Sequence, residues 1–154
     1  MITNTELEYK GDIYPTAIIS FEKEVDSVYF HTDNSVILKI TVLRDSLIRF
    51  RYTTKGYFSN DFSYAIDRSH SHGYNFLEVS EEKEYYKIKT SKVECRIQKT
   101  DMRVSIFDLK GAVLLEDELG FHWEESFEFG GNIVKMSKAS KDGECFYGLG
   151  DKAT

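Results

Sequence analysis

Hydrophobic and polar residues alternate with a period of two wherever this sequence is regular. In residues 36–42 every second side chain is apolar, and such side chains share one face of a β-strand. The apolar positions of this run are Val36, Leu38, Ile40 and Val42. After a short polar turn, residues 47–52 repeat the pattern with Ile48, Phe50 and Tyr52 on the apolar face. Two such runs joined by a short turn predict a β-hairpin.

Two more pairs of alternating runs predict further hairpins: residues 86–90 with 93–97, and residues 102–107 with 112–115. Gly111 lies in the second turn, where it can adopt the positive φ that a tight hairpin requires. Single strands are expected at residues 27–32, 133–138 and 144–149, and no long helix is expected. Short strands joined by hairpins predict an all-β fold, an antiparallel β-sandwich with little helix.

Two stretches interrupt the alternation and are expected to be loops, at residues 54–75 and 117–132. Both are rich in aromatic residues, among them Tyr57 and Tyr64 in the first and Trp123 in the second. Aromatic rings in loops could stack on sugar rings, because a pyranose presents an apolar face. Alternatively they close the open ends of the sandwich, which we favour because large aromatic side chains are usually buried.

The composition fits one globular domain of 154 residues with a formal net charge of −6. This charge argues against nucleic-acid or anionic-membrane partners, which are bound through clustered Lys and Arg. A catalytic (β/α)₈ barrel needs about 250 residues and does not fit in this length. The first residues lack the pattern of a signal peptide, which favours a cytoplasmic location. We expect residues 25–154 to form the sandwich, and residues 1–24 to be an N-terminal extension or its first edge strand.

Candidate catalytic and metal-binding groups are sparse. Cys95 and Cys145 are expected to be free, buried thiols, because both lie in alternating apolar stretches. His70 and His72 form at most half of a metal site, so we expect no metal and no cofactor. Adjacent acidic residues such as Asp117 and Glu118 would point to opposite faces of a strand, which is unsuitable for the paired carboxylates of a glycosidase.

The end of the chain carries a recognisable motif. Residues 146–152 resemble the "YGLGDK" signature that closes the N-terminal β-sandwich domain of glycoside hydrolase family 31, the α-glucosidase and α-xylosidase family. The strand at 47–52, the segment 62–66 and the strand at 93–98 agree with that family's layout. The matching motif residues are Tyr147, Gly148, Leu149, Gly150, Asp151 and Lys152. The sequence looks most like bacterial members of the family.

The resemblance implies a sandwich similar to galactose mutarotase, placed ahead of a (β/α)₈ barrel that carries both catalytic aspartates of a retaining enzyme. No catalytic residue of that family falls in this chain. The expected partners are the protein's own C-terminal catalytic barrel and the oligosaccharide substrate of the full enzyme. The motif would form the junction between the domains, so the chain would be non-catalytic and would pack on the barrel and shape its active-site mouth.

Three residues are candidate contacts with a sugar or with the barrel: Tyr57, Tyr64 and Trp123. An alternative function is an autonomous carbohydrate-binding module that uses these same rings as platforms. A third hypothesis, a mutarotase-like enzyme, rests on fold analogy alone and would need a convergent histidine and carboxylate. The four histidines, His31, His70, His72 and His122, show no motif for such a pair.

Overall fold

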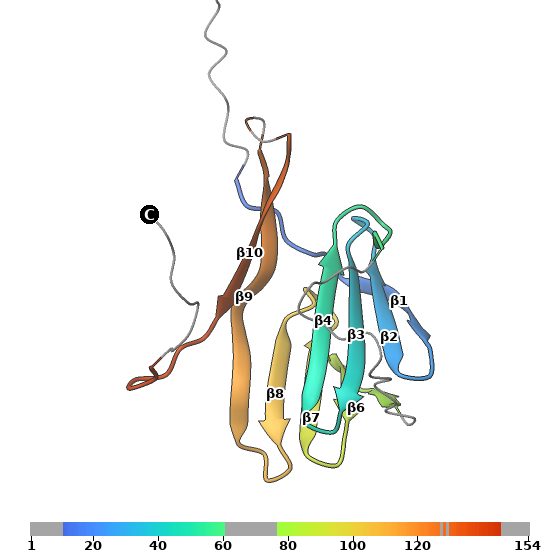
Figure 1. Ribbon diagram of the computed structural model, residues 1–154, viewed down its shortest axis with the longest axis vertical. Coiled ribbons are helices and arrows are strands. Elements are labelled where there is room, and N and C mark those ends of the chain that lie inside the picture. Colours follow the sequence, from blue (N-terminus) through green and yellow to red (C-terminus); the bar gives the residue numbers. More distant parts are fainter. Residues whose placement is uncertain (1–10, 61–76, 127, 129, 146–154) are drawn as a thin grey trace, which may run out of the picture.

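The computed structural model describes residues 11–60, 77–126, 128 and 130–145. In these residues the chain forms ten β-strands and no helix, and the strands make two antiparallel sheets that pack face to face (Figure 1). The predicted all-β antiparallel sandwich is therefore confirmed. Among the described residues, the larger sheet has six strands and the smaller sheet four, so the strands of the smaller sheet do not cover all of the larger one. This difference shapes the candidate site.

The smaller sheet has four strands in chain order: β1 (Ile18–Lys23), β2 (Ser27–Thr32), β3 (Ile37–Arg44) and β4 (Leu47–Thr53). The predicted hairpin is the β3–β4 pair, in which Ile40 lies opposite Phe50. Strand β1 is an edge of this sheet. The alternation of apolar residues places one face of β2 and β3 in the core and leaves the other face to solvent.

The larger sheet has the order β10-β9-β8-β7-β6-β5. Its strands are β5 (Glu78–Glu81), β6 (Tyr85–Lys89), β7 (Val93–Gln98), β8 (Val104–Asp108), β9 (Val113–Ser126) and β10 (Gly131–Lys138). Both predicted hairpins are present, as β6–β7 and β8–β9. Gly111 lies in the β8–β9 turn with φ of 88°, as the turn prediction requires.

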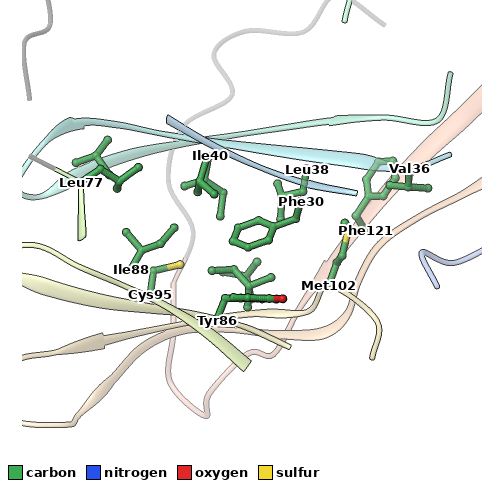
Figure 2. Packing of buried hydrophobic residues seen from close by; sticks show 14 of the residues in the cluster. Phe30, Val36, Leu38, Ile40, Leu77, Tyr86, Ile88, Cys95, Met102 and Phe121 are labelled. Carbon is green, nitrogen blue, oxygen red and sulfur yellow. The ribbon is translucent and has the colours of Figure 1, made fainter. Parts of the chain in front are cut away.

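The hydrophobic core fills the space between the sheets (Figure 2). Phe30, Leu38 and Ile40 from the smaller sheet face Ile88 and Cys95 from the larger one, and all five side chains are fully buried. Every second side chain of the paired strands is therefore buried, and each Å² of apolar surface removed from water stabilises the fold by about 25 cal/mol. This burial holds the two sheets together.

The predicted loop at residues 117–132 is wrong, because β9 continues to Ser126 and β10 begins at Gly131. The cause is a β-bulge: Ser137 of β10 pairs with Gly120, whereas the next residue, Lys138, pairs with Asp117. The extra residues on β9 interrupt the period of two that sequence reasoning relies on. Gly120 has φ of 69°, and a Cβ there would lie 3.0 Å from an oxygen of Asp117.

The two cysteines are free but differ in environment. Cys95 is fully buried, as predicted, whereas Cys145 is exposed, so its predicted burial is wrong. Lys141 and Glu144 form a turn, with the Glu144 N–H donating to the Lys141 carbonyl at 3.1 Å, and Cys145 follows it outside any strand. The remainder of the strand predicted at 144–149 lies outside the described residues.

Thiol titration with Ellman's reagent at pH 8 should therefore count one reactive cysteine in the native protein and two after unfolding. Burial, and secondarily the charge of Asp117, raise the pKa of the Cys95 thiol to about 12. At pH 8 only about one molecule in ten thousand would carry the reactive thiolate there. Cys145→Ser should remove the native signal and leave the second; rapid reaction of two thiols in the folded protein would contradict the buried position of Cys95.

Candidate functional site

The larger sheet presents exposed apolar side chains on the face that elsewhere forms the core. Val134 and Met136 of β10 lie opposite Trp123 and Phe121 of β9, and directly opposed residues point to the same side of a sheet. Val134 is 64% exposed and Met136 is 44% exposed. Leu115, which lies opposite the partly buried Ile106, continues the surface along β9 with 37% exposure. We call Leu115, Val134 and Met136 the apolar strip.

The apolar strip exists because the smaller sheet ends before the larger one does. Within the described residues β4 is the last strand of the smaller sheet, and its Tyr52 ring stacks on Phe121 of β9 at 4.3 Å with 7° between the ring planes. Strand β10 lies beyond β9 at the edge of the larger sheet, and the β9–β10 hairpin extends past the ends of the strands of the smaller sheet (Figure 1). Apolar surface is thus left facing solvent on the inner side of β10.

A cleft of about 380 Å³ adjoins this strip, between the segment that follows β4 and the first residues of β10. Its apolar lining comes from Tyr52, Phe121 and Val134. Its polar lining includes Thr54 and Asn132, and the Asn132 side-chain amide donates to the Thr54 hydroxyl oxygen at 2.8 Å. This hydrogen bond joins the two sheets and fixes the width of the cleft. We call this space the Asn132 cleft.

Behind the cleft, a buried ion pair anchors the bulge of β9. The Asp117 side chain is fully buried, accepts a hydrogen bond from the Val104 backbone N–H at 2.9 Å, and pairs with the Lys138 ammonium. Tyr52 lies near this carboxylate, and burial first, then the Asp117 charge, raise the pKa of its phenol far above the ordinary value. The Tyr52 phenol is therefore not poised to give up a proton to a substrate near neutral pH.

Residues 12–16 form a strap that runs beside β9, to which Ile13 is bridged, at the end of the sandwich. Ile13 and Trp123 exchange backbone hydrogen bonds of 2.7 and 3.0 Å. The Lys135 ammonium donates to Asp12 at 2.7 Å and to Glu124 at 3.0 Å, and these bonds raise its pKa. At the other end of the strap, the Asn34 side chain donates to the Tyr14 carbonyl at 2.9 Å.

The strap also covers His122, which lies close to a carboxylate. Among the described residues it is the only buried histidine with such a neighbour. His122 Nε2 lies 4.0 Å from Asp12, and the imidazole is stacked under the Tyr14 ring at 5.2 Å. His122 is only 3% exposed, so a substrate could not reach this pair. These contacts give His122 a structural role. The His122–Asp12 pair is therefore not the accessible acid–base pair that a mutarotase-like enzyme would need.

The predicted site residues fall in different environments. The motif at Tyr147, Gly148, Leu149, Gly150, Asp151 and Lys152 lies outside the described residues, as do Tyr64, His70 and His72. Tyr57 is 62% exposed, in the segment that borders the Asn132 cleft. Trp123 is 6% exposed and belongs to the hydrophobic core, as does Phe121, in agreement with packing rather than sugar stacking for these two rings.

Sequence reasoning missed Asn132 and Thr54, the residues that join the two sheets at the cleft. The signal available was the Gly130–Gly131 pair, which marks a chain reversal and would place Asn132 at the start of a strand. The described part of the chain contains no group of three or more His, Cys, Asp or Glu residues that could hold a metal ion. Nor does it contain a helix long and apolar enough to cross a membrane.

Comparison with protein families matches residues 37–154 to the glycosyl hydrolase 31 N-terminal galactose mutarotase-like domain. No curated protein matches the sequence. Among solved structures, a family 31 α-xylosidase from Xanthomonas citri is similar with a TM-score of 0.66 and 22% identity, over 79% of this chain and 14% of that one.

Two further structures resemble the chain in fold. A family 31 dextranase from Flavobacterium johnsoniae gives a TM-score of 0.62 at 18% identity, over 73% of this chain and 15% of the dextranase. A cycloalternan-forming enzyme from Listeria monocytogenes gives 0.60 at 17% identity, over 74% of this chain and 11% of that enzyme. The chain thus spans only a small part of each of these proteins.

Proposed function

Because this chain belongs to the family of glycosyl hydrolase 31 N-terminal galactose mutarotase-like domains, we propose that it serves as a non-catalytic domain of a larger retaining α-glycosidase. In this role it packs on a C-terminal catalytic barrel and shapes the mouth of the barrel's active site. The whole enzyme is α-glucosidase-like, and its substrate is an α-linked oligosaccharide. The family match and the small share of each similar structure that the chain spans support this proposal.

The observation that carries the packing role is the apolar strip. Leu115, Val134 and Met136 are exposed on the face of the sheet that otherwise forms the core. Exposed apolar side chains on a core-forming face are typical of protein interfaces, because contact with a second apolar surface removes both from water. Strand β10 is also the edge of its sheet in the described part of the chain, so a neighbouring domain can approach it from the side.

Chemistry is assigned to the barrel because the described residues offer no accessible catalytic pair. Asp117 is buried in its ion pair with Lys138, whereas the adjacent Glu118 is exposed. The two carboxyl groups of a glycosidase must instead converge on the two sides of one glycosidic bond. The chain alone should therefore leave p-nitrophenyl α-glucoside intact, and turnover by the pure chain would contradict the non-catalytic role.

The packing role is tested in the longer protein by placing charges on the apolar strip. Val134→Glu together with Met136→Glu should separate the unfolding of the sandwich from that of the catalytic domain, because burying unpaired carboxylates in an interface is unfavourable. Differential scanning calorimetry should then show two transitions in place of one. Leu109→Glu is the matched control, since Leu109 is 53% exposed in the β8–β9 turn, away from β10. Identical thermograms for the two variants would overturn the packing role.

A further inference from the structure

We propose that the Asn132 cleft is a binding site for a neutral oligosaccharide. The choice of sugar class rests on the proposed function, whereas the location of the site rests on the cleft itself. At about 380 Å³ the cleft falls within the size range of small-molecule sites. It lies between two chain segments that come from different sheets, so its walls are held by the fold and not by one mobile loop.

One wall of the cleft offers an apolar surface of the kind that carries the C–H face of a pyranose. The stacked rings of Phe121 and Tyr52 form this wall, and Val134, at the end of the apolar strip, borders it. Tyr57, which is 62% exposed, belongs to the segment that supplies the other wall. The Thr53 hydroxyl donates to the Tyr57 carbonyl at 2.8 Å and so fixes the backbone of this segment. The stacked rings along the first wall suit the C–H face of a sugar ring.

The polar lining suits hydroxyl groups. The Asn132 amide is held by its bond to Thr54, while its carbonyl oxygen and second amide hydrogen have no partner in the described part of the chain. An amide positioned in this way can both donate to and accept from vicinal hydroxyls. The Lys55 ammonium adds a donor, and it makes no ion pair with any described residue. A fixed donor and acceptor cost less ordering entropy on binding than a mobile side chain does.

The charge of the cleft favours a neutral ligand. Among the described residues that line it, Lys55 is the single charged side chain, and none is a carboxylate. The cleft therefore lacks the acidic ligands for a hard cation and the several basic groups that bind a polyanion. The described lining also holds no carboxylate and no imidazole that could act as a general acid or base, so we assign it binding without chemistry.

The test is a ¹H–¹⁵N NMR titration of the chain alone with isomaltotriose and with maltotriose. We expect saturable shifts at millimolar sugar that map to residues 53–59 and 130–134. Asn132→Ala should weaken binding about five- to tenfold through the loss of its hydrogen bonds. If Asn132→Ala fails to fold, Lys55→Ala provides the same test with a smaller loss. Lys110→Ala, in the exposed turn between β8 and β9, is the matched control and should bind as the unmodified chain does.

Three results would overturn the site: no shifts up to about 10 mM sugar, shifts that map to other residues, or equal affinity in the Asn132 and Lys110 variants. Displacement of the sugar by sodium phosphate would also overturn it, since an anion site would then be occupied. Because the chain is titrated without a catalytic domain, these results are independent of the charge variants of the apolar strip. If the titration shows no sugar binding but the charge variants still unfold in two transitions, the sugar site is excluded and the packing role stands.

Discussion

Trp123→Ala is expected to lower the free energy of unfolding by about 3–5 kcal/mol, as truncation of a large buried aromatic residue typically does. The indole is 6% exposed, lies 5.8 Å from the Phe121 ring, and belongs to the core cluster. Its removal would leave a cavity between the sheets and weaken the stack of Phe121 on Tyr52. Urea denaturation followed by circular dichroism measures the loss.

Tyr57→Ala provides the comparison, because Tyr57 is 62% exposed and should change stability by no more than about 0.5 kcal/mol. Comparing the two variants thus distinguishes a buried ring from an exposed one, although the sequence makes Trp123 and Tyr57 equal candidates for a sugar or barrel contact. Equal denaturation midpoints for Trp123→Ala and Tyr57→Ala would show that the indole is not in the core. A loss of sugar binding in Trp123→Ala would be uninformative by itself, since partial unfolding would also abolish it.

Asp117→Ala is expected to destabilise the fold by about 3 kcal/mol, in the range for breaking a buried ion pair. The carboxylate is fully buried, accepts from the Val104 N–H, and pairs with Lys138. Without it, the Val104 N–H would be buried without an acceptor, and the Lys138 ammonium would lose its counterion. Thermal and urea unfolding should both report the loss.

Lys138→Met is the matched variant, since it keeps the aliphatic stem and removes only the charge. Asp117→Ala leaves a Lys138 ammonium that is 35% exposed and can recover water, whereas Lys138→Met leaves the fully buried Asp117 carboxylate without its counterion. We therefore expect Lys138→Met to cost at least as much as Asp117→Ala. Either variant proving as stable as the unmodified chain would contradict the anchoring of the bulge by this ion pair.

The sequence predicts the strands well where alternation is unbroken. The β3–β4 hairpin follows directly from its apolar positions, because each side chain of the inner face is set by the period of two. For the β9–β10 hairpin the alternation predicts a loop instead, because the bulge at Gly120 changes the face on which later residues of β9 lie. In the sequence, such a local change of register is visible only as a break in the alternation of apolar and polar residues, and a loop produces the same break.

The candidate site was less accessible to sequence reasoning than the fold. The Asn132–Thr54 hydrogen bond joins residues 78 positions apart, and no local pattern brings them together. Trp123 is a candidate sugar or barrel contact from sequence because it lies in an aromatic-rich stretch expected to be a loop, yet its place in β9 puts the indole in the core. Exposure of a ring depends on which sheet covers it, which is a property of the tertiary structure.

The strap has a consequence for synthesis on the ribosome. Asp12 bonds to Lys135, 123 residues later, and Ile13 pairs with Trp123, so residues 12–16 leave the ribosome long before their partners exist. Strands β1 to β4 can pair in the order of their emergence, whereas the strap must wait until β9 and β10 have been made. Contacts of such high sequence separation form slowly. The first described residues of the chain would thus be among the last to reach their native positions.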